Sequence, residues 1–228
     1  MNNYDILAII PARGGSKGLL KKNIKPLNKR PLIYYAISEA KKAGIKRIVV
    51  STDNKEIEKA AVKYGSQTII RPKKLAKDST PMLPVIKHAL SVLRKEKYSP
   101  DIVLVLQPTS PLRKASDIKK ALKLLYVSKA DSVISVTKLK KPIEWVLEKN
   151  NKGFLVNNSS KKIYARQQAK ERYYPNGAIF VSWTESILKN NLLYGPKTTG
   201  YVMPEESSVD IDTELDFILA EKLLKGKK

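Results

Sequence analysis

The stretch ILAIIPARGGSKGLLKKN, residues 6–23, joins an apolar run to a loop rich in glycine and basic residues. Residues 6–10 are short, continuous and dominated by isoleucine, which is typical of a strand covered on both faces of a parallel sheet. The loop that follows has glycines, whose backbone N–H groups can face an anion, and basic side chains that can neutralise it. This order predicts an α/β fold with an anion-binding loop after its first strand.

The loop fits neither of the two common phosphate-binding signatures. Its last glycine is followed by Leu19, and its first two glycines are adjacent, so both GxxxxGK[ST] and GxGxxG fail. The cations that a triphosphate site requires are nevertheless present as Arg13, Lys17 and Lys22. The alternative interpretation is a flexible turn with solvated lysines.

Outward from this stretch, short apolar runs alternate with helical patterns. The further expected strands are residues 47–51, 67–70, 102–106, 132–136, 177–182 and 199–203. The expected helices are residues 31–43, 54–64 (with Asp53 as its cap), 84–95, 116–127, 185–189 and 213–224. This succession predicts a mostly parallel sheet with right-handed crossovers. Ligands of such sheets bind at the carboxyl ends of the strands, so the residues after each strand are the candidates for chemistry.

The alternation breaks over residues 138–175, where periodicity is weak and two Asn-Asn pairs mark turns. We expect an excursion of short strands here, within a single domain that spans residues 1–228. A chain of 228 residues with 42% hydrophobic residues can bury one sizeable core.

Composition excludes several classes of protein. The apolar runs are too short to span a bilayer, and the first residues lack a charged leader and a cleavage-site pattern, so we expect a cytoplasmic protein without membrane contact. The absence of cysteine excludes a thiol nucleophile and a cysteine zinc site. The single histidine, His88, excludes a multi-histidine metal site, and we interpret it as a structural or surface residue.

The net charge of +23 comes from 36 lysines and 8 arginines spread along the whole chain. Such a charge is compatible with a solvated basic surface or with a nucleic-acid-binding protein. The chain has no basic tail, no RNA-binding signature and few aromatic residues beside its lysines, which disfavours nucleic acid as a partner.

Two further segments offer polar side chains after strands. LQPTSPLR, residues 106–113, places the Gln107 amide at the carboxyl edge of the sheet, where it suits a substrate rich in hydroxyls; the alternative is an ordinary strand-to-helix turn. VDIDT, residues 209–213, projects Asp210 and Asp212 to one side of an extended backbone, a spacing suited to holding Mg²⁺ against phosphates. The alternative is that Asp212 caps the last helix.

YARQQ, residues 164–168, lies in the irregular excursion and is followed by Pro-Asn-Gly at residues 175–177. Arg166 could clamp a carboxylate through two parallel hydrogen bonds, or it could be an ordinary surface arginine. Spacing alone leaves both interpretations open.

Four segments together resemble one family. They are IIPARGGSKGLLKKN (9–23), LQPTSPLR (106–113), ARQQ with PNGAIFV (165–168 and 175–181) and SVDIDTELDF (208–217). In this order and spacing, the chain is similar over essentially its whole length to the acylneuraminate cytidylyltransferases, the CMP-sialic acid synthetase family. Near relatives in that family activate legionaminic and pseudaminic acids.

The resemblance implies a Rossmann-like nucleotide-diphospho-sugar transferase fold. It implies Mg²⁺-dependent transfer of CMP from CTP to the anomeric hydroxyl of a 2-keto sugar acid, with N-acylneuraminate first and other nonulosonic acids as alternatives, and release of pyrophosphate. It also implies a homodimer in which the 138–175 excursion reaches the partner's active site. A basic nucleic-acid-binding protein remains the alternative of another class.

The resemblance also implies roles for individual residues. The nucleotide would contact Arg13, Gly14, Gly15, Ser16, Lys17, Lys22, Asn23, Arg71 and Ser79. The sugar acid would contact Gln107, Arg166, Gln168 and Asn176, and Asp210 and Asp212 would bind the metal. The groups expected to act in catalysis are Lys17, Arg166 and Asp212. The chain departs from the family at Pro81, where a hydroxyl residue is common, and at Tyr174, where some members carry arginine.

Overall fold

The computed structural model describes residues 4–15, 18–157, 159 and 165–226, and it is built on a seven-stranded sheet in the order β11-β7-β10-β6-β1-β4-β5. The strands are β1 Ile6–Pro11, β4 Arg47–Thr52, β5 Gln67–Ile70, β6 Ile102–Val105, β7 Ser132–Lys138, β10 Tyr173–Trp183 and β11 Thr198–Val202. Neighbouring strands are parallel except where β10 runs antiparallel to β6 and β7. The predicted mostly parallel sheet is confirmed.

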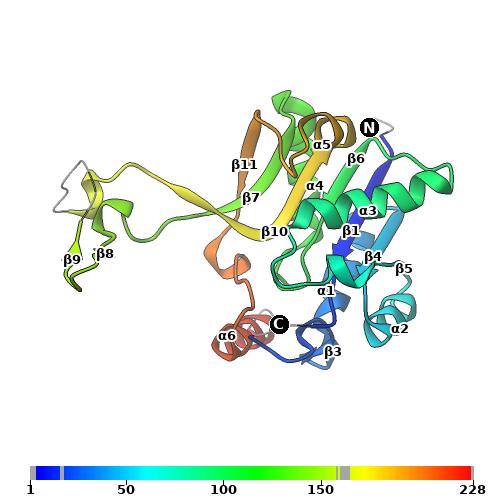
Figure 1. Cartoon of the computed structure of the whole chain (residues 1–228), viewed down its shortest axis with the longest axis horizontal. Helices are drawn as coiled ribbons and strands as arrows, with labels where there is room; N and C mark the ends of the chain where they lie inside the picture. Colours follow the sequence, from blue (N-terminus) through cyan, green and yellow to red (C-terminus); the bar gives the residue numbers. More distant parts are fainter. Residues whose placement is uncertain (1–3, 16–17, 158, 160–164, 227–228) are drawn as a thin grey trace.

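Helices cover both faces of this sheet (Figure 1). They are α1 Leu32–Lys42, α2 Lys55–Lys63, α3 Met82–Lys95, α4 Ala115–Ser128, α5 Thr184–Asn190 and α6 Glu214–Lys225. Along β1, Ala8 and Ile10 pack in the cluster formed with α1, α2 and α4, whereas Leu7 and Ile9 pack in the cluster formed with α3 and α5. Successive residues of a strand point to opposite faces, so a sheet covered on both sides requires a strand that is apolar throughout.

A third apolar cluster joins segments that are far apart in the sequence. It combines Leu19 and Leu27, which follow the glycines of the first loop, with Ile211 and Phe217. Helix α6 therefore packs against the glycine-rich loop that follows β1. The shorter elements outside the arm include the hairpin of β2 Pro26–Leu27 and β3 Arg30–Pro31 and the 3-10 turns η1 Lys22–Ile24, η2 Lys73–Leu75 and η5 Glu205–Ser207.

The excursion predicted after residue 138 leaves the sheet as an arm, which we define as residues 139–172. It extends from the paired ends of β7 and β10 and stands away from the rest of the molecule (Figure 1). It contains the β8 Glu148–Lys149 and β9 Leu155–Val156 hairpin and the turns η3 Ile143–Trp145 and η4 Arg166–Gln168. Its large apolar side chains are exposed, as Phe154 and Leu155 show at 66% each.

The expectation that Asp53 caps a helix is wrong, and so is the alternative interpretation of Asp212 as a helix cap. Asn54, not Asp53, caps α2, because its Oδ1 atom accepts hydrogen bonds from the N–H groups of Glu56 (2.8 Å) and Ile57 (3.1 Å). Thr213, not Asp212, caps α6. The side chains of Asp53 and Asp212 instead accept hydrogen bonds from the N–H of Gly14 and the ammonium of Lys22. Within the described part of the chain, no helix is long and apolar enough to cross a membrane.

Candidate active site

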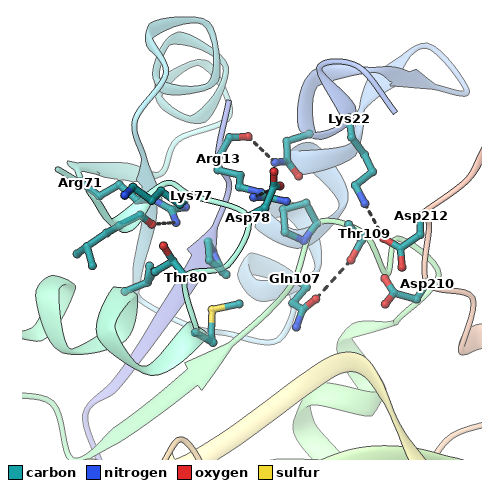
Figure 2. Close-up of a pocket in the computed structure, with 16 residues that line it drawn as sticks. Arg13, Lys22, Arg71, Lys77, Asp78, Thr80, Gln107, Thr109, Asp210 and Asp212 are labelled. Carbon is teal, nitrogen blue, oxygen red and sulfur yellow. Dashed lines mark hydrogen bonds and ion pairs between the residues drawn. The ribbon is translucent and has the colours of Figure 1, made fainter. Parts of the chain in front are cut away.

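A cleft of about 340 Å³ lies at the carboxyl ends of β1, β5 and β6, where the topology of the sheet predicts a ligand (Figure 2). Its polar lining comes from four segments that follow strands or precede α6. These residues are Arg13, Lys22, Asn23, Arg71, Lys77, Asp78, Thr80, Gln107, Thr109, Asp210 and Asp212. Met82 and Val85 of α3 and Leu75 add an apolar wall. The cleft thus combines cations, carboxylates and an amide beside an apolar surface.

The first loop is held by contacts to its own backbone. Asn23 donates a hydrogen bond from Nδ2 to the carbonyl of Arg13 (2.9 Å), and the N–H of Gly14 donates to Oδ1 of Asp53 (2.9 Å). A Cβ atom on Gly14 would lie 2.8 Å from the Cβ of Asn54, so the loop approaches α2 as closely as only glycine allows. The N–H of Gly14 therefore already donates to a carboxylate, whereas a Cβ atom on Gly15 would have no heavy atom within 4 Å. Ser16 and Lys17 lie outside the described residues.

Two cations of the cleft, Arg13 and Lys22, are paired with carboxylates. The guanidinium of Arg13 forms an ion pair with Asp78. The ammonium of Lys22 donates to the carbonyl of Ile211 (2.7 Å) and to Oδ1 of Asp212 (2.9 Å). The Arg13–Asp78 pair is partly exposed on both sides, whereas in the second pair only Asp212 is exposed; an ion pair that solvent reaches contributes about 0–1 kcal/mol. An incoming polyphosphate can therefore displace either carboxylate at little energetic cost.

Asp210 and Asp212 lie side by side at one end of the cleft (Figure 2). The Asp210 side chain remains accessible, but the surrounding protein removes part of its hydration and, with the charge of Asp212, raises its pKa, against opposing effects of Thr109, Lys22 and Arg113. Among the described residues, no group of three or more histidines, cysteines or carboxylates gathers as a metal cluster. Two carboxylates beside a phosphate-sized cleft fit Mg²⁺, which is commonly held by one or two carboxylates together with substrate phosphates.

The Gln107 amide lies beside this carboxylate pair. Its Oε1 atom is 3.5 Å from the Thr109 hydroxyl, and Thr109 also accepts the N–H of Ile211 at its carbonyl (2.8 Å). Gly177 of β10 adopts a φ of +73°, and a Cβ atom there would lie 3.3 Å from Asp210 Oδ2 and 3.5 Å from Gln107 Oε1. The backbone of β10 thus closes the cleft on the side where Gln107 and Asp210 meet.

Arg71 forms part of the wall through backbone contacts. Its side chain is buried and donates to the carbonyls of Ser51 (2.7 Å) and Leu75 (3.3 Å). Burial lowers the pKa of Arg71 to about 10, while Asp53 acts in the opposite direction. Arg71 therefore lines the cleft and also ties the η2 segment to the end of β4.

The family model described as Cytidylyltransferase matches residues 7–225. The chain belongs to the cytidylyltransferase family. It is 35% identical to the post-translational flagellin modification protein B of Campylobacter coli, over 98% of this chain and 96% of that protein. It is also 35% identical to the CMP-N,N'-diacetyllegionaminic acid synthase of Legionella pneumophila, over 96% of each chain.

This cytidylyltransferase is 38% identical to the N-acylneuraminate cytidylyltransferase of Escherichia coli over 94% of its own length, but it spans only 51% of that protein. Its fold is similar to that of a CMP:2-keto-3-deoxy-manno-octonic acid synthetase solved with CTP, with a TM-score of 0.68 and 16% identity over 98% of this chain and 99% of the other. The fold is also similar to that of a 4-diphosphocytidyl-2C-methyl-D-erythritol synthase from Anaerococcus prevotii, with a TM-score of 0.65 and 17% identity over 96% of this chain and 98% of the other. The predicted Rossmann-like nucleotidyltransferase fold and family are confirmed.

Several residues predicted for the site lie elsewhere in this cytidylyltransferase. Arg166 and Gln168 belong to the arm, and Arg166 lines a separate cavity of about 340 Å³ there. Asn176 is buried (3% exposed): its Oδ1 atom accepts from the Ser135 hydroxyl (2.6 Å), and its Nδ2 donates to that of Ser208 (2.8 Å). Both ends of the Asn176 amide thus serve the fold, and the cleft of one chain contains Gln107 without Arg166 or Gln168.

The segment after β5 to which the sequence resemblance gives a nucleotide role lines the cytidylyltransferase cleft, but through other residues than the predicted Ser79. Ser79 is exposed, whereas its neighbours Asp78 and Thr80 line the cleft. Thr80 therefore supplies a hydroxyl one position before Pro81, whereas the family pattern described above has a hydroxyl residue at position 81 itself. Sequence reasoning also missed Thr109 and Arg113, although both lie in the quoted LQPTSPLR motif, because their contacts are made with backbone groups of distant segments.

Proposed function

We propose that this cytidylyltransferase transfers CMP from CTP to the anomeric hydroxyl of a sialic-acid-like 2-keto sugar acid and releases pyrophosphate. The observation that carries the proposal is the joining of three groups in one cleft: the cations Arg13 and Lys22, the carboxylates Asp210 and Asp212, and the Gln107 amide. A triphosphate, a metal ion and a hydroxyl-rich acceptor each require one of these groups.

The reaction depends mainly on positioning and on neutralising charge. Arg13 and Lys22 would leave their carboxylate partners and bind the triphosphate, with Lys17 expected beside them from the sequence. Asp210 and Asp212 would hold Mg²⁺, which neutralises charge on the phosphate oxygens when bound. The oxygen of the sugar hydroxyl would then attack the α-phosphorus in line. The bond from that phosphorus to the departing pyrophosphate would break, and the hydroxyl proton would be released.

The apolar wall suits the base. Met82, Val85 and Leu75 lie at the end of the cleft where Arg71 and Thr80 offer polar atoms. A pyrimidine packed on such a wall would present its edge to these polar groups. The sugar acid would occupy the other end, beside Gln107 and Gly177.

We propose that the enzyme is a homodimer in which the partner's arm completes the sugar end of the cleft. Two features support this, the basic lining of the arm cavity and the exposed apolar side chains of the arm. The arm cavity that contains Arg166 also contains the basic residues Lys138, Lys140, Lys141, Lys170 and Arg172. Several of these are paired with glutamates, as Arg172 is with Glu144. The arm also exposes apolar side chains such as Phe154 and Leu155, which a second chain would cover.

The acceptor is proposed as N-acylneuraminate or a related nonulosonic acid. Legionaminic acid is the second candidate, because the relative named for its diacetyl form matches this chain over nearly the full length of both proteins. The nucleic-acid-binding alternative has no comparable support, since a cation-lined enzyme cleft accounts for the anion-binding loop. CTP is a cytoplasmic metabolite, so we propose that the enzyme acts in the cytoplasm.

The test is pyrophosphate release with Mg²⁺, CTP and a panel of N-acetylneuraminic, legionaminic, pseudaminic and 3-deoxy-octulosonic acids. Release with one of the nine-carbon acids, absent when UTP or ATP replaces CTP, is the expected result and names the acceptor. A folded protein that binds no CTP and releases no pyrophosphate with any acid would overturn the proposal.

A further inference from the structure

Arg113 is a fully buried arginine beneath the candidate site, with 2% of its surface exposed. It follows the Gln107 loop and points back under it. One terminal nitrogen donates to the carbonyl of Ala178 (2.6 Å), and the other makes a short contact with the carbonyl of Gln107. The planar guanidinium therefore bridges two backbone segments, in a geometry that a lysine ammonium cannot reproduce.

The two segments that Arg113 joins both shape the acceptor end of the cleft. Gln107 is the second residue after β6, and Ala178 lies where the pairing of β10 with β7 shifts register, between Pro175 and Phe180. Such an irregularity leaves carbonyl groups outside the ladder, and burial makes an unsatisfied carbonyl costly. Arg113 satisfies one of these carbonyls and at the same time sets where the irregular segment lies.

Gly177, the residue before Ala178, is the point on which the acceptor-side atoms converge. A Cβ atom on Gly177 would lie within 3.5 Å of Asp210 Oδ2, Gln107 Oε1 and the Ser110 hydroxyl. The Ser110 hydroxyl itself donates to the carbonyl of Asn176 (3.4 Å), a second connection between the same two segments. The Asp210 segment is itself tied to the Gln107 loop, because the N–H of Ile211 donates to the carbonyl of Thr109 (2.8 Å). A shift of this loop relative to β10 would therefore change the separation of the Gln107 amide and the Asp210 carboxylate from the Gly177 backbone.

The side chain of Arg113 keeps its positive charge although it is buried. Burial lowers the pKa of Arg113 to about 9, and the charges of Glu39, Asp210 and Asp117 act in the opposite direction. The guanidinium therefore remains positive near neutral pH. Burying a charge is costly unless the charge is hydrogen-bonded, and the carbonyls of Ala178 and Gln107 supply hydrogen bonds to this guanidinium.

We propose that Arg113 is a positioning residue for the acceptor: by bridging the Gln107 and Ala178 carbonyls, it sets the distance between the Gln107 amide and the β10 backbone at Gly177. The inference rests on the proposed function. Arg113 does not line the cleft, so it acts through Gln107 and β10 rather than on either substrate. Its influence is directed to the sugar acid, because the CTP side of the cleft is built by other segments.

The test compares Arg113→Lys with Arg94→Lys, an exposed arginine of α3 that serves as the matched control. Arg113→Lys keeps the charge but cannot bridge both carbonyls. We expect it to raise the KM for the sugar acid about tenfold or more, since misplacement by about 1 Å can cost a hundredfold in rate. The KM for CTP should stay within about twofold of wild type, and Arg94→Lys should leave both constants unchanged.

A double-mutant cycle with Gln107→Ala separates positioning from a merely structural role. If Arg113 acts through Gln107, Arg113→Lys should have little further effect on the sugar KM once the amide is gone. Additive effects, or equal rises in the KM for CTP and the KM for the sugar, would overturn the inference. If Arg113→Lys does not fold, Ser110→Ala tests the same connection and should raise the sugar KM alone; an unchanged sugar KM would then overturn it.

Wild-type turnover on the acid panel is measured first, which separates the two levels of the argument. Without turnover on any acid, the proposed function fails and the inference fails with it. With wild-type turnover and an additive cycle, the inference alone fails.

Discussion

The ammonium of Lys22 lies 2.9 Å from Oδ1 of Asp212, and this ion pair joins two loops that are 190 residues apart in the sequence. One loop carries the expected triphosphate ligands and the other the expected metal ligands. The Lys22 side chain is 12% exposed, whereas that of Asp212 is 74% exposed. The lysine is therefore held in place by the protein, while the aspartate is free to bind a second cation from solvent.

Asp212→Ala should abolish most turnover without unfolding the protein. A carboxylate that holds a metal ion contributes several kcal/mol to transition-state stabilisation, so kcat should fall by about a hundredfold or more. The melting temperature should change little, because Thr213 rather than Asp212 caps α6. Steady-state kinetics and thermal melting measure the two effects. Glu206→Ala, an exposed carboxylate close in sequence, is the control, and equal activity of the two variants would remove Asp212 from the metal site.

Gly18→Ala should destabilise the protein through a backbone clash. A Cβ atom at Gly18 would lie 2.3 Å from the carbonyl oxygen of Asp212, and neither backbone segment can yield without moving the other. We expect a loss of about 1–3 kcal/mol, as for other overpacked sites. For a chain of this size, each kcal/mol lowers the melting temperature by roughly 2–4 °C.

Gly15→Ala is the matched control for this prediction, because a Cβ atom at Gly15 has nothing within 4 Å. Thermal melting of the two variants should differ, with only Gly18→Ala shifted downward. Equal melting temperatures would mean that the loop and the Asp212 segment can separate freely.

The proposed contribution of the partner's arm can be tested by complementation. Arg166→Ala and Asp212→Ala chains should each be nearly inactive alone. In a mixed dimer, the cleft of the Arg166→Ala chain has an intact Asp212 and receives the arm of the Asp212→Ala chain, which has an intact Arg166. One of the two sites of the mixed dimer is therefore restored. Random mixing should therefore recover about a quarter of wild-type activity. Coexpression of the two chains checks this, and no recovery beyond the sum of the single variants would place Arg166 outside the partner's site.

Asp210→Asn should stabilise the metal-free protein in a pH-dependent way. The pKa of Asp210 is raised, chiefly by lost hydration and also by Asp212, so the folded protein releases this proton at a higher pH than the unfolded chain does. The ionised carboxylate therefore disfavours the folded state above the unfolded pKa of about 3.9, and the penalty is absent below it.

The melting temperature of Asp210→Asn should exceed that of wild type at pH 7, and the gain should shrink as the pH falls toward 4. Added Mg²⁺ should stabilise wild type more than the variant, because a bound cation favours the ionised carboxylate. A gain that is independent of pH would mean that the substitution acts through packing instead.

The sheet could be predicted from the sequence because its strands are buried on both faces and therefore read as continuous apolar runs. The start of β10 was missed, since Tyr173 and Tyr174 lie at the exposed base of the arm and carry no such signal. The cap of α2 was misplaced because Asp53 and Asn54 are both capable residues, and the choice depends on the distant N–H of Gly14, which engages Asp53.

The same distinction holds for the site. Arg13, Gln107 and Asp210 could be predicted because each lies in a segment whose position follows from the order of strands. Asp78 and Arg113 could not, because one acts as the ion-pair partner of Arg13 and the other reaches carbonyls that only the folded chain brings near. Such contacts leave no periodicity or spacing in the sequence.

The apolar cluster that packs Leu19 against Ile211 and Phe217 has a consequence for synthesis of the protein. Most of the parallel sheet can form while the ribosome is still translating the later residues, but the cleft needs the segment around Ile211 before its two ends meet. A chain interrupted before that point would keep the glycine-rich loop but lack both carboxylates. Translation thus produces the glycine-rich loop before the two carboxylates, and a complete site can form only after most of the chain has been made.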